Sequence, residues 1–141
     1  MSIAIILDAA ALDGEPYSAA TRGLIERTLE RDGELWCTAV NLAEVCRGRA
    51  RTAEVESFLR RGVGVGAKKT SVNIRSTDEA FAKRVGTVLH ASSRGSEDIA
   101  DAHVVALCAE FETAIVLSVD PEDILSLAEA VPAVRVLVRR P

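Results

Sequence analysis

The sequence has few of the residues that build several common kinds of functional site. It holds three cysteines and two histidines among 141 residues, and Cys37, Cys46 and Cys108 form no CxxC pair. This pattern indicates neither a zinc site nor a disulfide framework. It favours a reduced, intracellular protein.

Aromatic residues and long apolar runs are also scarce. Only 4% of the chain is aromatic, so we expect a core of Ala, Val, Leu and Ile and no aromatic surface for stacking bases. The first apolar run, Ile3 to Leu7, is shorter than a signal-peptide core and far shorter than the roughly 20 residues that span a bilayer. We therefore expect a cytoplasmic protein without a membrane segment.

The charge balance is slightly acidic but uneven along the chain. The net charge is -4, which argues against the general basic footprint of a nucleic-acid binder. A local basic excess can nevertheless hold phosphates, and Arg47 is our candidate for a contact with a substrate phosphate. Such an excess lies between Glu44 and Lys69, a stretch that holds three glutamates and seven basic residues: Arg47, Arg49, Arg51, Arg60, Arg61, Lys68 and Lys69. For Arg60 and Arg61 we prefer solvation of a helix surface.

Short apolar runs alternate with helical patterns over a length that fits one domain, residues 1–141. The first run is continuous rather than alternating, as in a strand buried on both faces. These features predict an α/β fold, a three-layer sandwich with a central, mostly parallel five-stranded sheet. The predicted strands are Ile3–Leu7, Leu35–Cys37, Ser71–Ile74, Ala114–Ser118 and Val134–Val138. The predicted helices are Tyr17–Arg31, Thr38–Gly48, Thr52–Arg61, Thr77–Ala91 with Thr77 as its cap, Glu97–Glu110 capped by Ser96, and Pro121–Ala130.

Acidic residues follow the predicted strands at positions that place them on one edge of the sheet. Asp8 directly follows the first strand, and Asp120 follows the fourth. Glu44 lies a turn into the helix after the second strand, and Asp101 about a turn into the helix before the fourth. Ligands of such sheets bind at the carboxyl ends of the strands. Converging carboxylates raise each other's pKa, and a hard divalent cation, Mg²⁺ or Mn²⁺, compensates for that repulsion.

A site of this kind serves phosphodiester hydrolysis, but each acid also has a simpler explanation. Asp8 has the position of a helix cap, and Asn41 with Glu44 has capping-box spacing. Asp98 and Asp101 would favour a helix dipole, while Asp120 before Pro121 is an ordinary turn opening. We expect His103 and Cys108 to be packing residues. What favours a common site is that all four acids fall at strand ends or first helical turns.

Four ordered segments resemble the motifs of PIN domains, particularly the VapC-type toxins of bacterial toxin–antitoxin pairs. They are Leu7–Leu12, Asn41–Val45, Asp98–Ala106 and Val116–Asp123. The resemblance implies a metal-dependent endoribonuclease, a sheet in the order 3-2-1-4-5 and a VapB-like antitoxin as partner. It also implies that Asp8, Glu44, Asp101 and Asp120 hold the metal, with Asp98 and Asp123 in support. Ser118 stands where the family usually has Thr and keeps the hydroxyl, so together with Arg47 it is a candidate for substrate binding.

Three other functions fit the sequence less well. A phosphorylation-dependent receiver needs a lysine after its fifth strand, but the last lysine is Lys83. An aspartyl phosphatase needs Asp-x-Asp, whereas Asp8 is followed by Ala9 and Ala10. A catalytically inactive PIN-like binding module is disfavoured by the complete acidic set. We also predict a homodimer, because the apolar helix Thr77–Ala91 exceeds what so small a domain readily covers, and an RNA recognised by its shape.

Overall fold

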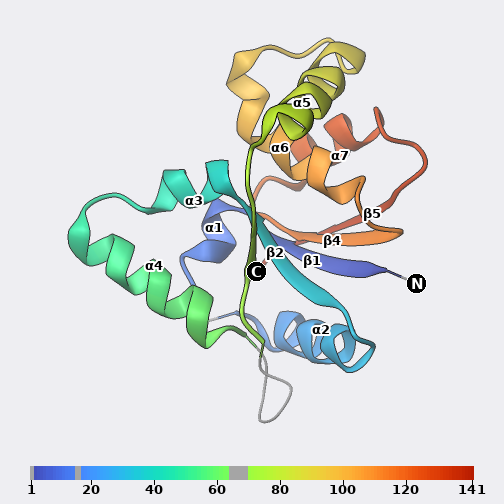
Figure 1. The fold of residues 1–141 in the computed structure, drawn as a ribbon. Coiled ribbons are helices and arrows are strands. Elements are labelled where there is room, and N and C mark those ends of the chain that lie inside the picture. Colours follow the sequence, from blue (N-terminus) through green and yellow to red (C-terminus); the bar gives the residue numbers. More distant parts are fainter. Residues whose placement is uncertain (1, 15–16, 64–69) are drawn as a thin grey trace.

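A five-stranded parallel sheet forms the centre of the molecule (Figure 1). The computed structural model describes residues 2–14, 17–63 and 70–141. The strands are β1 (Ile3–Leu7), β2 (Glu34–Thr38), β3 (Asn73–Arg75), β4 (Thr113–Leu117) and β5 (Arg135–Arg139). They lie in the order β3-β2-β1-β4-β5, and all four pairings are parallel. The predicted fold class and strand order are therefore confirmed.

Helices cover both faces of the sheet. Figure 1 shows α5, α6 and α7 on one side and α2 and α4 on the other. The helices are α1 (Ala9–Leu12), α2 (Ala19–Glu30), α3 (Ala39–Val45), α4 (Arg49–Arg61), α5 (Glu79–Ala91), α6 (Ile99–Cys108) and α7 (Pro121–Ala128), with a short 3-10 turn at Ser96–Asp98. In the described part of the chain, none of these helices is long and apolar enough to cross a membrane.

The central strands supply side chains to two separate cores. Ile5 and Leu7 of β1 pack with α1, α2 and α4, whereas Ala4 and Ile6 pack with α5, α6 and α7. Successive side chains of a strand point to opposite faces, so a continuous apolar run is what a strand covered on both sides requires. The same alternation holds for β4. The sheet is thereby fixed in place by burial on both faces.

Several helix boundaries and one buried face differ from the prediction; α3 ends at Val45 rather than Gly48, and α4 begins at Arg49 rather than Thr52. Asp78, not Thr77, caps α5, because its Oδ1 accepts a hydrogen bond from the amide of Phe81 (2.8 Å). Ser96 begins the 3-10 turn rather than the long helix, and α6 starts only at Ile99. The apolar spacing of the sequence places Ile99 and Ala109 at the two ends of a buried stripe on this helix, but both residues are exposed. Every residue between Ala102 and Cys108 is buried, because neighbours surround this helix on several sides.

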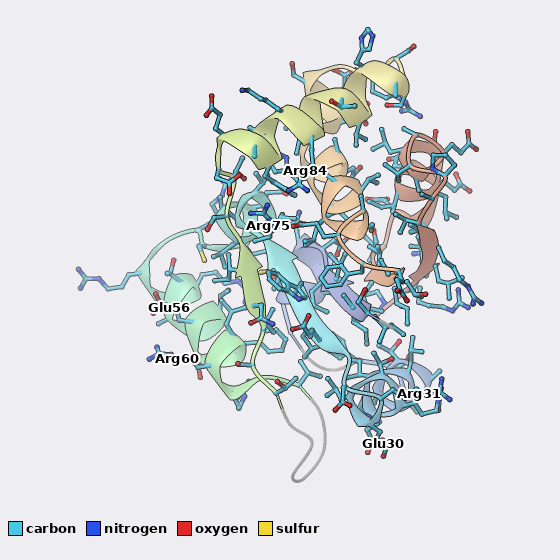
Figure 2. All side chains as sticks on the ribbon, turned by 45° about the vertical axis from the view of Figure 1, so that its right-hand side comes forward. Glu30, Arg31, Glu56, Arg60, Arg75 and Arg84 are labelled. Carbon is cyan, nitrogen blue, oxygen red and sulfur yellow. The ribbon has the colours of Figure 1, made fainter. Side chains whose placement is uncertain are left out.

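Arg75 connects the start of α5 with the residues that follow α6. Arg75, which ends β3, places its guanidinium 4.3 Å from the centre of the Phe81 ring and donates from Nε to Glu110 (2.9 Å). Figure 2 shows Arg75 and Arg84 together at this end of α5. Phe81 and Val85 are buried. The apolar side of α5 that suggested dimerisation is thus largely covered within one chain.

Candidate functional site

Asp8 and Ser118 lie side by side at the carboxyl edge of the sheet. Leu7 of β1 pairs with Leu117 of β4, and the amide of Asp8 donates to the Leu117 carbonyl (3.2 Å). The next residue on each strand is therefore Asp8 or Ser118. Asp8 also caps α1, since its Oδ1 accepts from the Ala11 amide (3.2 Å). The capping interpretation is confirmed, and it fixes the Asp8 carboxylate at the edge.

The environment of Asp8 favours the protonated form of its carboxyl group. Burial raises the pKa of Asp8 above its ordinary value and is the largest effect. Hydrogen bonds from the Ser118 hydroxyl and from backbone amides lower the pKa in part, while the charge of Asp120 raises it. Ser118 is itself buried, and its Oγ accepts a hydrogen bond from the Asp120 amide (3.0 Å). One hydroxyl thus connects Asp8 with the segment that carries Asp120.

Asp101 shows most directly that the aspartates share one site. It lies in the first turn of α6, and its pKa is raised to about 6, mainly by burial. The next causes are the negative charges of Asp123, Asp8, Asp98 and Asp120. Like charges disfavour each other's ionised form. The five aspartates, which come from three segments, therefore lie close enough for four of them to affect the ionisation of Asp101. The structure therefore brings together five of the six predicted acidic residues.

Glu44 is the exception. It is exposed on α3, and its Oε1 accepts a hydrogen bond from Nδ2 of the buried Asn41 (2.9 Å). Its charge is not among those that shift the pKa of Asp8 or Asp101. The expected capping box is also absent from α3, because Thr38 provides the cap by accepting from the Asn41 amide (3.0 Å). Since α3 packs against α1 and α6, Glu44 lies beside the aspartates rather than among them.

The donor set suits a hard divalent cation in its chemistry. Carboxylate oxygens are the ligands that Mg²⁺ and Mn²⁺ prefer. In the ranges 2–14, 17–63 and 70–141, no three His, Cys, Asp or Glu side chains are grouped closely enough to hold a metal ion. Asp120 and Asp123 are exposed, whereas the carboxylate of Glu44 is held by Asn41. The residues fit such an ion by charge and by the shared edge of the aspartates, and binding requires their carboxylates to move closer together.

Asp98 is paired with an arginine that the sequence pattern did not single out. Oδ2 of Asp98 lies 3.6 Å from Nη1 of Arg94, whose Nη2 donates to the Ser126 hydroxyl on α7 (2.7 Å). Arg94 thereby connects the segment before α6 with the helix that follows Asp120. The available signal was the four-residue spacing of Arg94 and Asp98, which suits an ion pair on a helical turn.

The predicted basic stretch is divided between free and paired residues. Arg47 lies exposed between α3 and α4. Arg51 pairs with Asp13 and Glu54. Arg60 pairs with Glu56 at 3.7 Å, and Figure 2 labels these two residues on α4. These partners weaken the local positive charge. Lys68 and Lys69 lie outside the described residues.

His103 and Cys108 have no direct place in the acidic site. His103 is buried beside the Phe81 ring, and its Nδ1 lies 2.7 Å from the Ile99 carbonyl oxygen. Burial raises the pKa of the Cys108 thiol to about 12, so this cysteine is a poor nucleophile. The structure thus agrees with the expectation that both are packing residues.

Comparison with known proteins gives a family match and a fold match. The model of the PIN domain family matches residues 5–129. The structure is similar to a chain of the 2.2 Å resolution structure of VapBC-1 from nontypeable Haemophilus influenzae, with a TM-score of 0.54 and 12% sequence identity over 97% of each chain. No curated protein sequence matches the chain. The solved structure supports the fold, and the family match spans most of the sequence.

Proposed function

The chain belongs to the PIN domain family, and from this premise we propose that it is a metal-dependent endoribonuclease, the toxin of a toxin–antitoxin pair. The observation that carries the proposal is the group of aspartates at the carboxyl edge. The pKa of Asp101 is raised to about 6 by burial and by the negative charges of Asp123, Asp8, Asp98 and Asp120. A protein keeps such repulsion where a function needs it, and a divalent cation for phosphodiester hydrolysis is the compensating ligand.

We assign the metal to Asp8, Asp101 and Asp120, with Glu44 as the fourth ligand. Asp123 supports them from the first turn of α7, and Asp98 supports them as the partner of Arg94. When bound, Mg²⁺ or Mn²⁺ supplies Lewis acidity and positive charge for hydrolysis of a phosphodiester.

The protein's own groups prepare this edge. Ser118 holds Asp8 and the Asp120 backbone in a fixed relation through one hydroxyl. Asn41 holds Glu44 by its side-chain amide, so that this carboxylate starts from a defined position beside the aspartates. The backbone amides of α1 that contact Asp8 stabilise its charged form against burial. Groups fixed in advance lower the reorganisation that a reaction requires.

The partners follow from the same proposal. The structural similarity to a chain of VapBC-1 supports a VapB-like antitoxin for this chain. We propose a cytoplasmic homodimer as the working form. The apolar side of α5 is largely covered within one chain, but an apolar hollow lined by Val88, Ala106 and Val131 supports self-association. Sedimentation tests this, and a monomer at micromolar concentration contradicts it.

The decisive experiment measures cleavage of total RNA by the purified chain, freed of any bound protein. We expect cleavage with Mg²⁺ or Mn²⁺ and none with EDTA. Asp8→Asn and Asp101→Asn should lose the activity. Asp32→Asn is the matched control, since it removes one acidic charge before β2, at the opposite edge of the sheet, and Asn accepts the positive φ of 61° at that position. Equal cleavage by the aspartate variants, or cleavage in EDTA, contradicts the proposal.

A further inference from the structure

A third residue occupies the same edge next to Ser118. Leu117 of β4 pairs with Arg139 of β5, and the Ser118 amide donates to the Arg139 carbonyl (2.9 Å). Arg140 therefore follows β5 as Ser118 follows β4. Neighbouring strands lie about 4.8 Å apart, so the Arg140 backbone is about one strand from Ser118 and about two from Asp8.

The Arg140 backbone is held in place while its side chain is available. The hydroxyl of Thr21, a buried residue of α2, donates to the Arg140 carbonyl (3.0 Å). Arg140 is exposed and lines a surface pocket together with Asp120, Glu122 and Asp123. Within the part of the chain that the structure describes, no ion pair or hydrogen bond engages its guanidinium group. This arginine thus lies beside carboxylates without pairing with them.

We propose that Arg140 binds a phosphate of the RNA backbone next to the phosphate that is cleaved. The inference rests on the proposed function and adds a substrate-binding residue to it. A row of aspartates repels a polyanion, so binding needs a cation close to the acids but not neutralised by them. A guanidinium group binds phosphate with two parallel hydrogen bonds. Such a contact positions the RNA strand without selecting its sequence.

The location of Arg140 also complements that of Arg47. Arg47 is exposed after α3, the helix that follows β2, whereas Arg140 follows β5. In the sheet order, β1 and β4, which are followed by Asp8 and Asp120, lie between the two strands that precede these arginines. An RNA strand that crosses this edge would place backbone phosphates near both cations while one phosphodiester faces the aspartates.

The test compares Arg140→Ala and Arg140→Lys with Arg135→Ala. Arg135 is exposed at the start of the same strand, so its variant removes the same charge at the opposite edge of the sheet. Binding of a fluorescently labelled single-stranded RNA is measured by anisotropy over a series of salt concentrations. All variants carry Asp101→Asn, which prevents cleavage during the titration. Cleavage kinetics are measured separately in the chains that keep Asp101.

We expect Arg140→Ala to weaken binding about threefold to tenfold and to lower the slope of log affinity against log salt by about 0.7, the value for one phosphate contact with a single strand. Arg140→Lys should restore most of the salt slope, and Arg135→Ala should change neither quantity. In cleavage, Arg140→Ala should raise KM with little change in kcat.

Two results would overturn the inference. One is an unchanged salt slope in Arg140→Ala, and the other is a shift in the pH profile of cleavage without weaker binding, which indicates that Arg140 only neutralises nearby acids. If RNA binds with the expected dependence on Arg140 but no chain cleaves it, the proposed function fails, and of the inference only the contact between Arg140 and an RNA phosphate is kept. If no RNA binds, both fail.

Discussion

The raised pKa of Asp101 leads to a quantitative prediction about stability. The pKa rises from 3.8 to about 6 on folding, so the folded chain binds the proton more tightly than the unfolded chain does. Each pKa unit corresponds to about 1.4 kcal/mol. Because Asp101 is only half-buried, solvent screening reduces the effect of this shift, and ionising Asp101 in the folded state costs about 1 to 2 kcal/mol at neutral pH.

The sign follows from linkage. Below pH 3.8, Asp101 is protonated in both states, and it destabilises neither. Between about pH 3.8 and about pH 6 the unfolded chain has released this proton while the folded chain still binds it, so the free energy of unfolding falls over this range and stays low above it. Asp101→Asn does not titrate. We expect the variant to be more stable than the original chain by about 1 to 2 kcal/mol above about pH 7, with the difference nearly gone near about pH 4.

Urea unfolding in EDTA at these two pH values measures the effect. Asp32→Asn, which removes an acid remote from the carboxyl edge, should show no comparable pH-dependent gain. Adding Mg²⁺ should stabilise the original chain by favouring its folded state and should have a smaller effect on Asp101→Asn. If Asp101→Asn gains no more stability at neutral pH than at acid pH, the electrostatic account of the site is wrong.

Two further predictions concern the groups that hold the aspartates in place. Ser118→Ala should raise the pKa of Asp8 further and shift the pH profile of RNA cleavage upward, because the hydroxyl lowers that pKa. Ser118→Thr should keep the original profile. Equal pH profiles in the two variants would contradict this prediction. Arg94→Ala should lower kcat and cost about 1 kcal/mol in urea unfolding, because it releases both Asp98 and Ser126. Arg94→Lys should recover part of both losses, and unchanged kinetics in Arg94→Ala would show that Asp98 needs no such partner.

The sequence indicates one sheet edge for Asp8 and Asp120 because few topologies suit its pattern, and the resemblance to PIN domains supplies the strand order that makes β1 and β4 neighbours. Continuous apolar runs require strands covered on both faces, and parallel strands require helical crossovers. Once β1 and β4 are neighbours, Asp8 and Asp120 must lie at one edge. That conclusion depends only on strand direction and order, which small errors in element boundaries do not change.

The details that the sequence missed depend on tertiary contacts. Thr77 and Asp78 are both good caps, and the choice between them depends on where the helix axis starts. Ile99 has the spacing of a buried residue but lies before the part of α6 that its neighbours cover. Glu44 has the expected place on α3, yet the pairing with Asn41 keeps its carboxylate beside the aspartates. Pattern and spacing assign such residues to a region and leave their contacts undetermined.

The distribution of arginines around the edge explains how a chain with a net charge of -4 can act on RNA. Arg51 and Arg60 have acidic partners on or near α4 and contribute little free charge. Arg94 is committed to Asp98 and Ser126. Arg140 alone lines a pocket with site carboxylates while its guanidinium remains unpaired in the described part of the chain. Because phosphate affinity depends on local cations rather than on the total charge, replacing Arg140 should weaken RNA binding more than replacing Arg51 or Arg60, although each substitution changes the net charge equally.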